Sequence, residues 1–201
     1  MSALVWGNVP VPNTASWTAE EGLSLGRCPH FADAGLPALV QPCAQGQGKP
    51  LFGKPHSNRQ REAMARCLCD ICGKSLKTST KVSLSHARPY PHGAEGWAVL
   101  QVEPMMHRSC AAIAVQHCPS LKRDVEQGTL MIRQVLRYRV QCAIMSPEYV
   151  EGETGQAVKA LGHAKIELLR WKDRDLDWLI GSSAHAYPQP GHVRASDWLF
   201  P

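Results

Sequence analysis

Four side chains in two closely spaced pairs have the types and the spacing that bind a metal ion. Cys69 and Cys72 are separated by two residues, and after 34 intervening residues His107 and Cys110 repeat that separation. Thiolate and imidazole ligands in two such pairs are typical of tetrahedral structural zinc sites. Gly73 directly follows the first pair and relieves the backbone of the tight turn that this pair needs. We therefore predict one structural Zn²⁺ ion held by these four side chains.

The other thiols fit this site less well. The chain has eight cysteines, at positions 28, 43, 67, 69, 72, 110, 118 and 142. Cys67 would need a Cys-x-Cys pairing, and Cys118 lies about 10 Å further along the expected helix than the second pair. Cys28, Cys43 and His30 stay open as a second, partial site, although none of them belongs to a pair with ligand spacing.

Length and composition favour a folded protein in a reducing compartment. The chain has 201 residues, of which 44% are hydrophobic and 19% charged, so it can bury a core without disulfide bonds. It has no run of 18 apolar residues, and its first residues do not form a basic segment followed by an apolar one. We therefore expect no membrane-spanning helix and a cytoplasmic location, where clustered thiols usually bind metal.

Basic residues are concentrated around the first cysteine pair. Between Lys54 and Arg88 there are eight basic and two acidic residues, whereas the whole chain has 22 and 17. Phosphate contacts dominate non-specific affinity for DNA and RNA, so this excess predicts a nucleic-acid-binding surface. An alternative is an ordinary solvated helix face with some loop lysines. The candidate phosphate ligands are Arg59, Arg61, Arg66, Lys74, Lys77, Lys81 and Arg88.

Elements that can position these residues follow from the pattern around them. Ser57 is a good N-cap for a helix over residues 58–67, and alternation predicts a strand over residues 82–85. A second strand over 97–102 follows a Pro/Gly-rich loop, and a very apolar helix over 106–116 ends before a proline. The second cysteine–histidine pair then opens a helix, whose positive N-terminal end favours a thiolate at Cys110.

The C-terminal half has a different character. Residues 130–144 form a long β-like run with basic residues among apolar ones, whereas 165–171 fits a strand or a helix and 155–162 a helix or a turn. Residues 176–180 are apolar enough to dock on the core.

Four regions follow from these patterns. They are an irregular N-terminal arm (1–57), a zinc-binding core (58–120), a β-rich part that packs on the core (121–181) and a Pro-containing tail (182–201).

The segment from Cys69 to Ala111 resembles the treble-clef zinc fold and, within it, the HNH-type nuclease module. Residues 69–73 match the zinc knuckle, residues 83–89 match a strand that ends in a catalytic histidine, His86, and residues 102–110 match the approach to the second ligand pair. The resemblance covers about 45 residues and implies a structural zinc ion, a catalytic divalent metal ion and activation of water by His86. The expected fold is α+β: a treble-clef or HNH-like core stabilised by zinc, an irregular arm and an additional β-containing C-terminal region.

The sequence departs from the HNH pattern at the catalytic metal. Such nucleases usually have an acidic residue before the histidine and a histidine after the last zinc cysteine, where this chain has Ser85 and Ala111. Glu95 or Glu103 would have to supply the missing carboxylate, because a lone histidine cannot hold Mg²⁺. Only His86 of the catalytic set is present.

Three functions are compatible with these features. The first is a zinc-stabilised module that binds DNA or RNA without catalysis, and the second is a metal-dependent nuclease that uses His86. The third is a protein-interaction or inhibitory factor in which zinc only builds the scaffold, since the chain also resembles uncharacterised proteins of bacterial viruses and prophages. Motifs for nucleotide binding, serine hydrolases, zinc proteases and EF-hands are absent.

Overall fold

The protein has a mixed α+β fold. A computed structural model describes residues 4–31, 35–93 and 96–181, so the predicted tail lies outside the described residues. The helices are η1 (Thr18–Glu20, 3-10), α1 (Ser57–Arg66), α2 (Arg108–His117), α3 (Pro119–Glu126), α4 (Pro147–Thr154) and α5 (Leu176–Ile180). The strands are β1 (Val5–Trp6), β2 (Val9–Pro10), β3 (Ala15–Trp17), β4 (Ser24–Gly26), β5 (Ala38–Val40), β6 (Pro50–Pro55), β7 (Lys81–Ser85), β8 (Tyr90–Pro91), β9 (Trp97–Gln101), β10 (Met106–His107), β11 (Met131–Met145) and β12 (Ala160–Arg174).

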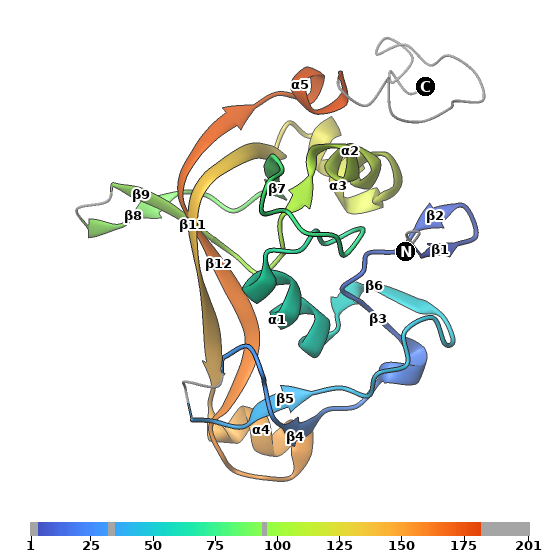
Figure 1. Ribbon diagram of the computed structural model, residues 1–201, viewed down its shortest axis with the longest axis vertical. Coiled ribbons are helices and arrows are strands. Elements are labelled where there is room, and N and C mark those ends of the chain that lie inside the picture. The colour runs from blue at the N-terminus through green and yellow to red at the C-terminus, as the bar shows by residue number, and fades with distance from the viewer. Residues whose placement is uncertain (1–3, 32–34, 94–95, 182–201) are drawn as a thin grey trace.

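A long antiparallel ribbon of β11 and β12 runs through the whole molecule (Figure 1). The two strands have 15 residues each, with α4 at the connected end and α5 directly after β12. The ribbon is the centre of the main sheet, whose strand order is β10-β7-β11-β12-β5-β4, with β9 also paired to β12. The β-like run is therefore confirmed as β11, and the ambiguous segment 165–171 lies inside β12.

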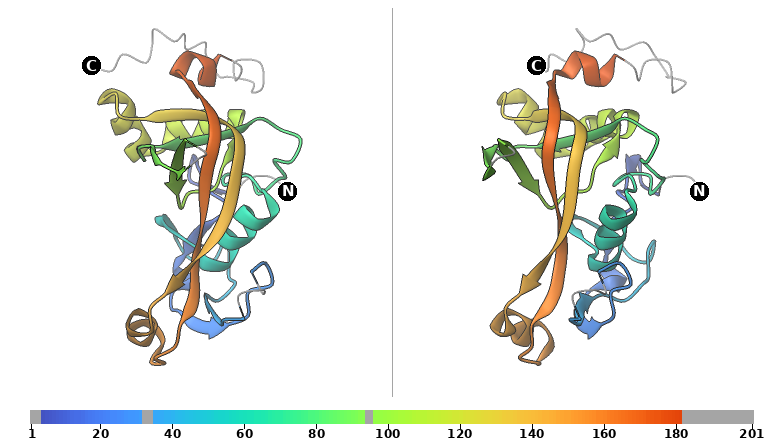
Figure 2. Two further views of the ribbon diagram at one scale, coloured as in Figure 1. Left: turned by 90° about the vertical axis from the view of Figure 1, so that its left-hand side faces the viewer. Right: turned by 60° about the vertical axis from the view of Figure 1, so that its left-hand side comes forward.

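Helix α1 packs against the ribbon, which passes beside it in both views of Figure 2. The buried amide of Gln60 makes this contact specific, because it accepts from the backbone N–H of Ala164 at 2.9 Å and donates to the carbonyl of Ala164 at 2.8 Å. The predicted N-cap is wrong by one residue. Ser57 is the first helical residue, and the imidazole of His56 accepts from the backbone N–H of Arg59 instead.

The main core lies between β7, the ribbon, α2 and α5. Its members include Val82 and Leu84 on β7, Ala111 on α2 and Ile166 on β12, all with at most 4% of their surface exposed. Leu179 on α5 is fully buried, which confirms that segment 176–180 docks on the core. Within the described residues, no helix is long and apolar enough to cross a membrane.

The N-terminal arm is made of short strands rather than irregular chain alone. Strand β3 pairs with β6, and β5 joins the main sheet in parallel to β12 through Ala38 and Leu161. The first strand pair, β1 and β2, lies near the amino end of the described chain (Figure 1).

Candidate metal centre

The first ligand pair lies in a tight knuckle directly after α1. The backbone N–H of Cys69 donates to the carbonyl of Lys74 at 2.8 Å, and the N–H of Gly73 donates back to the carbonyl of Cys69 at 2.9 Å. Gly73 has a φ of 66°, and a Cβ there would lie 2.9 Å from the side chain of Asn13. Glycine is therefore required both by the turn and by the close approach of the arm.

The second pair is carried by β10 and the first turn of α2. His107 is the N-cap of α2 and pairs across the strands with Lys81 on β7. Cys110 follows in the first helical turn, where backbone N–H groups stabilise a thiolate. A backbone hydrogen bond of 3.0 Å from Asp70 to Met105 joins this segment to the knuckle.

These two segments bring the four predicted ligands together. The ligand atoms of Cys69, Cys72, His107 and Cys110 all lie within 4.8 Å of one another. Nδ1 of His107 lies 3.4 Å from Sγ of Cys72 and 4.0 Å from Sγ of Cys110. Three sulfurs and one imidazole nitrogen form a closed donor set, which is compatible with a structural zinc ion.

The orientation of His107 is fixed from outside the cluster. Its Nε2 lies 3.2 Å from the carbonyl oxygen of Ser75. Donation to that carbonyl places the proton on Nε2 and leaves the Nδ1 lone pair facing the sulfurs. The ring nitrogen that does not bind the metal usually donates to a carbonyl or carboxylate in this way. The sequence gives no signal for Ser75, because its contribution is a backbone atom on a loop.

The thiols also differ in how readily they lose their protons. A hydrogen bond from Cys110 lowers the pKa of Cys69 to about 5, against the effect of burial. The same hydrogen bond raises the pKa of Cys110, and burial raises that of Cys72. One thiolate is therefore favoured before metal binds, and a bound cation would displace the remaining protons.

The N-terminal arm closes over the knuckle, which the sequence did not predict. The backbone N–H of Asn13 donates to the carbonyl of Asp70 at 2.7 Å, and the Thr14 hydroxyl donates to the Asp70 carboxylate. These contacts join residues more than 50 positions apart, and no local pattern signals them.

The predicted phosphate-binding residues separate into two groups. Arg59 and Arg61, on α1, point into the protein. Arg59 makes two contacts with the fully buried Glu20, from Nη1 to Oε1 at 2.6 Å and from Nη2 to Oε2 at 2.7 Å. Arg61 is only 1% exposed. These two arginines therefore lie away from the surface where we expected them, because acceptors on the arm and on β12 hold them inside.

The second group lies at the surface. Lys74, Lys77 and Arg88 are exposed, and Lys81 is half-buried with its ammonium group 3.4 Å from the carbonyls of Lys77 and Ser79. Arg66 is 60% exposed and forms an ion pair with Glu62 one helical turn earlier.

His86 lies directly after β7 and is exposed. It lines a largely apolar cavity of about 860 Å³, together with His117 and Asp124 from the α2–α3 region and Glu103. Glu95, the other candidate carboxylate, lies outside the described residues.

Among the residues that the structure describes, the Cys₃His cluster is the only group of three or more His, Cys, Asp or Glu side chains close enough to hold a metal ion. The alternative set of Cys28, Cys43 and His30 does not form such a group there.

Comparisons with known proteins identify no relative of this chain. No protein family, curated protein or solved structure matches the chain. The assignment of a possible metal site therefore depends on the converging ligands alone.

Proposed function

We propose that this protein binds nucleic acid without catalysis, through lysines held on a zinc-stabilised, degenerate HNH-like core. The observation that carries the proposal is the loop between the knuckle and β7. It contains Lys74 and Lys77 and ends at Lys81, the first residue of β7, and the chain has no acidic residue between Gly73 and Gly93. The loop thus has a net positive charge that no neighbouring residue in sequence cancels.

This loop is anchored at three points. The carbonyl of Ser75 receives the hydrogen bond from His107, the backbone N–H of Leu76 donates to the carbonyl of Cys67 at 2.8 Å, and the Leu76 side chain is fully buried. Lysines on an anchored loop lose less conformational freedom on binding than lysines on a free chain. Zinc would act by holding both the knuckle and His107, and a reducing compartment would keep the three thiols available.

A salt titration of duplex binding tests the proposal. The variant Lys74→Gln/Lys77→Gln/Lys81→Gln removes three phosphate contacts, and each contact adds about 0.9 to the slope of log K against log salt. We expect the slope to become shallower by about 2.7, equally for unrelated sequences, because phosphate contacts carry no sequence information. Fluorescence anisotropy with the zinc-loaded protein measures this slope.

A matched variant separates the loop from general charge. Lys54→Gln/Lys159→Gln/Lys172→Gln also removes three exposed lysines, which lie on other parts of the chain. Equal loss of binding in both variants would exclude the proposed surface. No duplex binding at low salt would exclude nucleic-acid binding and favour protein interaction. Cleavage of the duplex with Mg²⁺ that is lost in His86→Ala would favour a nuclease instead.

A further inference from the structure

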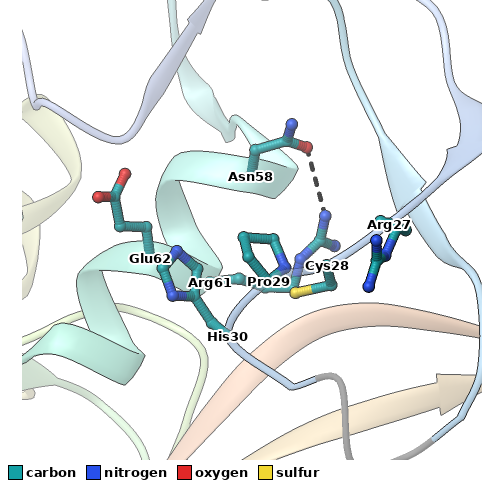
Figure 3. Close-up of a pocket in the computed structure, with 7 residues that line it drawn as sticks. All are labelled: Arg27, Cys28, Pro29, His30, Asn58, Arg61 and Glu62. Atoms are coloured by element: carbon teal, nitrogen blue, oxygen red, sulfur yellow. Dashed lines mark hydrogen bonds between the residues drawn. The ribbon is translucent and has the colours of Figure 1, made fainter.

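A second, smaller cavity lies between α1 and the segment Arg27–His30 of the arm. It has a volume of about 160 Å³ and is lined by Arg27, His30, Asn58, Arg61 and Glu62, together with the segment Cys28–Pro29. In Figure 3, Arg27 and Glu62 lie at opposite ends of the labelled group, with Arg61 and Pro29 between them. Three of the lining side chains are basic.

Arg61 has more donors than acceptors. Its Nη1 donates to the carbonyl of Gly162 at 3.0 Å, and its Nη2 donates to the carbonyl of Leu39 at 2.8 Å and to Oδ1 of Asn58 at 3.3 Å (Figure 3). A guanidinium has five N–H donors, and the buried Nε of Arg61 has no partner in the described structure. A buried donor without an acceptor destabilises the fold unless a bound group accepts its hydrogen bond.

The charge of Arg61 is also not neutralised. All three of its partners are neutral oxygens, and no carboxylate of the described residues lies within 4.0 Å of its guanidinium. Glu62 lines the same cavity, but its carboxylate pairs with Arg66. Buried charges in proteins are normally paired, so an unpaired guanidinium beside a cavity is a site where an anion is favoured.

We infer that this cavity binds a small oxyanion such as phosphate or sulfate. Arg61 supplies the buried charge, and Arg27 and His30 complete the basic lining from the arm. The volume is well below the roughly 300–1,000 Å³ of pockets that enclose drug-sized ligands, so it suits a group of a few heavy atoms. Guanidinium groups match the oxygen geometry of such anions. The inference does not depend on the proposed binding of nucleic acid by the lysine loop.

Inorganic phosphate is the probe for this site. We expect phosphate to raise the melting temperature of the wild-type protein more than sodium chloride at equal ionic strength, because it binds only the folded state. Arg27→Gln/His30→Gln removes the outer part of the site and leaves the buried Arg61 in place. We expect about tenfold weaker phosphate binding in this variant, measured by ³¹P nuclear magnetic resonance titration.

Two further variants make the result specific. Arg170→Gln removes an exposed arginine on β12 and should leave the phosphate affinity unchanged. Glu62→Gln removes the negative charge from the lining and should tighten phosphate binding about twofold to fivefold. No phosphate-specific stabilisation of the wild type, or equal affinity in the wild type and Arg27→Gln/His30→Gln, would overturn the inference.

A duplex titration of Arg27→Gln/His30→Gln distinguishes the source of the anion. Unchanged duplex affinity, which we expect, assigns the site to a free oxyanion. A parallel loss of duplex affinity assigns the same site to a backbone phosphate.

Discussion

Helix α1 and the loop after the knuckle carry the same density of positive charge and use it in opposite ways. Each has three basic residues within eight positions, residues 59–66 in α1 and 74–81 in the loop with the first residue of β7. In α1, two of the three cations are directed into the protein, where they hold the arm and β12. In the loop, Lys74 and Lys77 remain exposed. Charge counted along a sequence therefore does not measure charge at a surface.

The difference follows from the side chains themselves. A guanidinium is weakly hydrated and offers several donors in a fixed plane, so it can satisfy backbone carbonyls and carboxylates inside a protein. An ammonium group is strongly hydrated, and burying it costs more. Arg59 and Arg61 act as internal cross-links for this reason, whereas the loop has only lysines to offer to a polyanion.

Loss of a ligand from the metal centre should have the largest effect, because this centre holds the loop in place. Cys69→Ser or Cys110→Ser removes a ligand from a site whose structural zinc would contribute about 10–16 kcal/mol of apparent binding energy. We expect insoluble or unfolded protein, loss of the one zinc ion per chain, and the same unfolding of the wild type after chelation. Metal analysis and circular dichroism measure these outcomes.

The control for the metal site is an exposed thiol. Cys43→Ser should keep both the zinc content and the fold. Soluble, folded wild-type protein without any metal would contradict a structural zinc site.

Loss of the buried ion pair between Arg59 and Glu20 should have the next largest effect on stability. Arg59→Met leaves the fully buried Glu20 without its cation, which should lower the free energy of unfolding by about 3–5 kcal/mol. Arg66→Met, seven residues along the same helix, removes only an exposed ion pair and should change it by less than about 1 kcal/mol. Urea denaturation measures both, and equal effects would refute the contrast between the two arginines.

A pH titration sharpens the account of this buried cluster. Burial lowers the pKa of His56 below its usual value of 6.5, and the charges of Arg59 and Arg61 lower it further. The unfolded chain then binds a proton that the folded protein resists, so stability falls as the pH drops below about 6.5. Burial raises the pKa of Glu20, but hydrogen bonds from Arg59 and the backbone of Ala44 outweigh it and lower that pKa, which adds a further loss below about 4.5.

The corresponding variant is His56→Gln. It should flatten the dependence of the free energy of unfolding on pH between about 7 and 5, by about 1.4 kcal/mol for each unit by which burial lowers the pKa. The comparison uses the slope with pH, because loss of the His56 cap changes the stability at every pH. Protonation of the metal ligands affects both proteins and cancels in the difference. A variant with the slope of the wild type would show that His56 does not titrate in this way.

Local patterns were sufficient for the parts of the fold that are themselves local. Three such features depend on neighbouring residues and are present in the structure. They are the two ligand pairs, helix α1 and the long strand β11. The cap of α1 was missed because the imidazole of His56 replaces the hydroxyl that Ser57 offers one residue later.

Contacts between distant segments were not predictable in the same way. Glu20 lies 39 residues before Arg59, and the carbonyl of Gly162 lies 101 residues after Arg61. No periodicity or spacing signals either pairing, so both arginines were assigned to the surface. The Ser75 carbonyl that orients His107 was missed because the peptide group is common to all residues.

The parallel pairing of β5 with β12 constrains the order in which segments can pair during synthesis of the chain. Ala38 and Leu161 are neighbours in the sheet, yet 123 residues separate them in the chain. All four candidate zinc ligands are translated by residue 110, so they can leave the ribosome and meet while β12 is still being made. The arm, although translated first, cannot complete its pairing until β12 has been made. Until then its apolar strand edge is open, and a cell that makes this protein must keep that edge from pairing with another nascent chain.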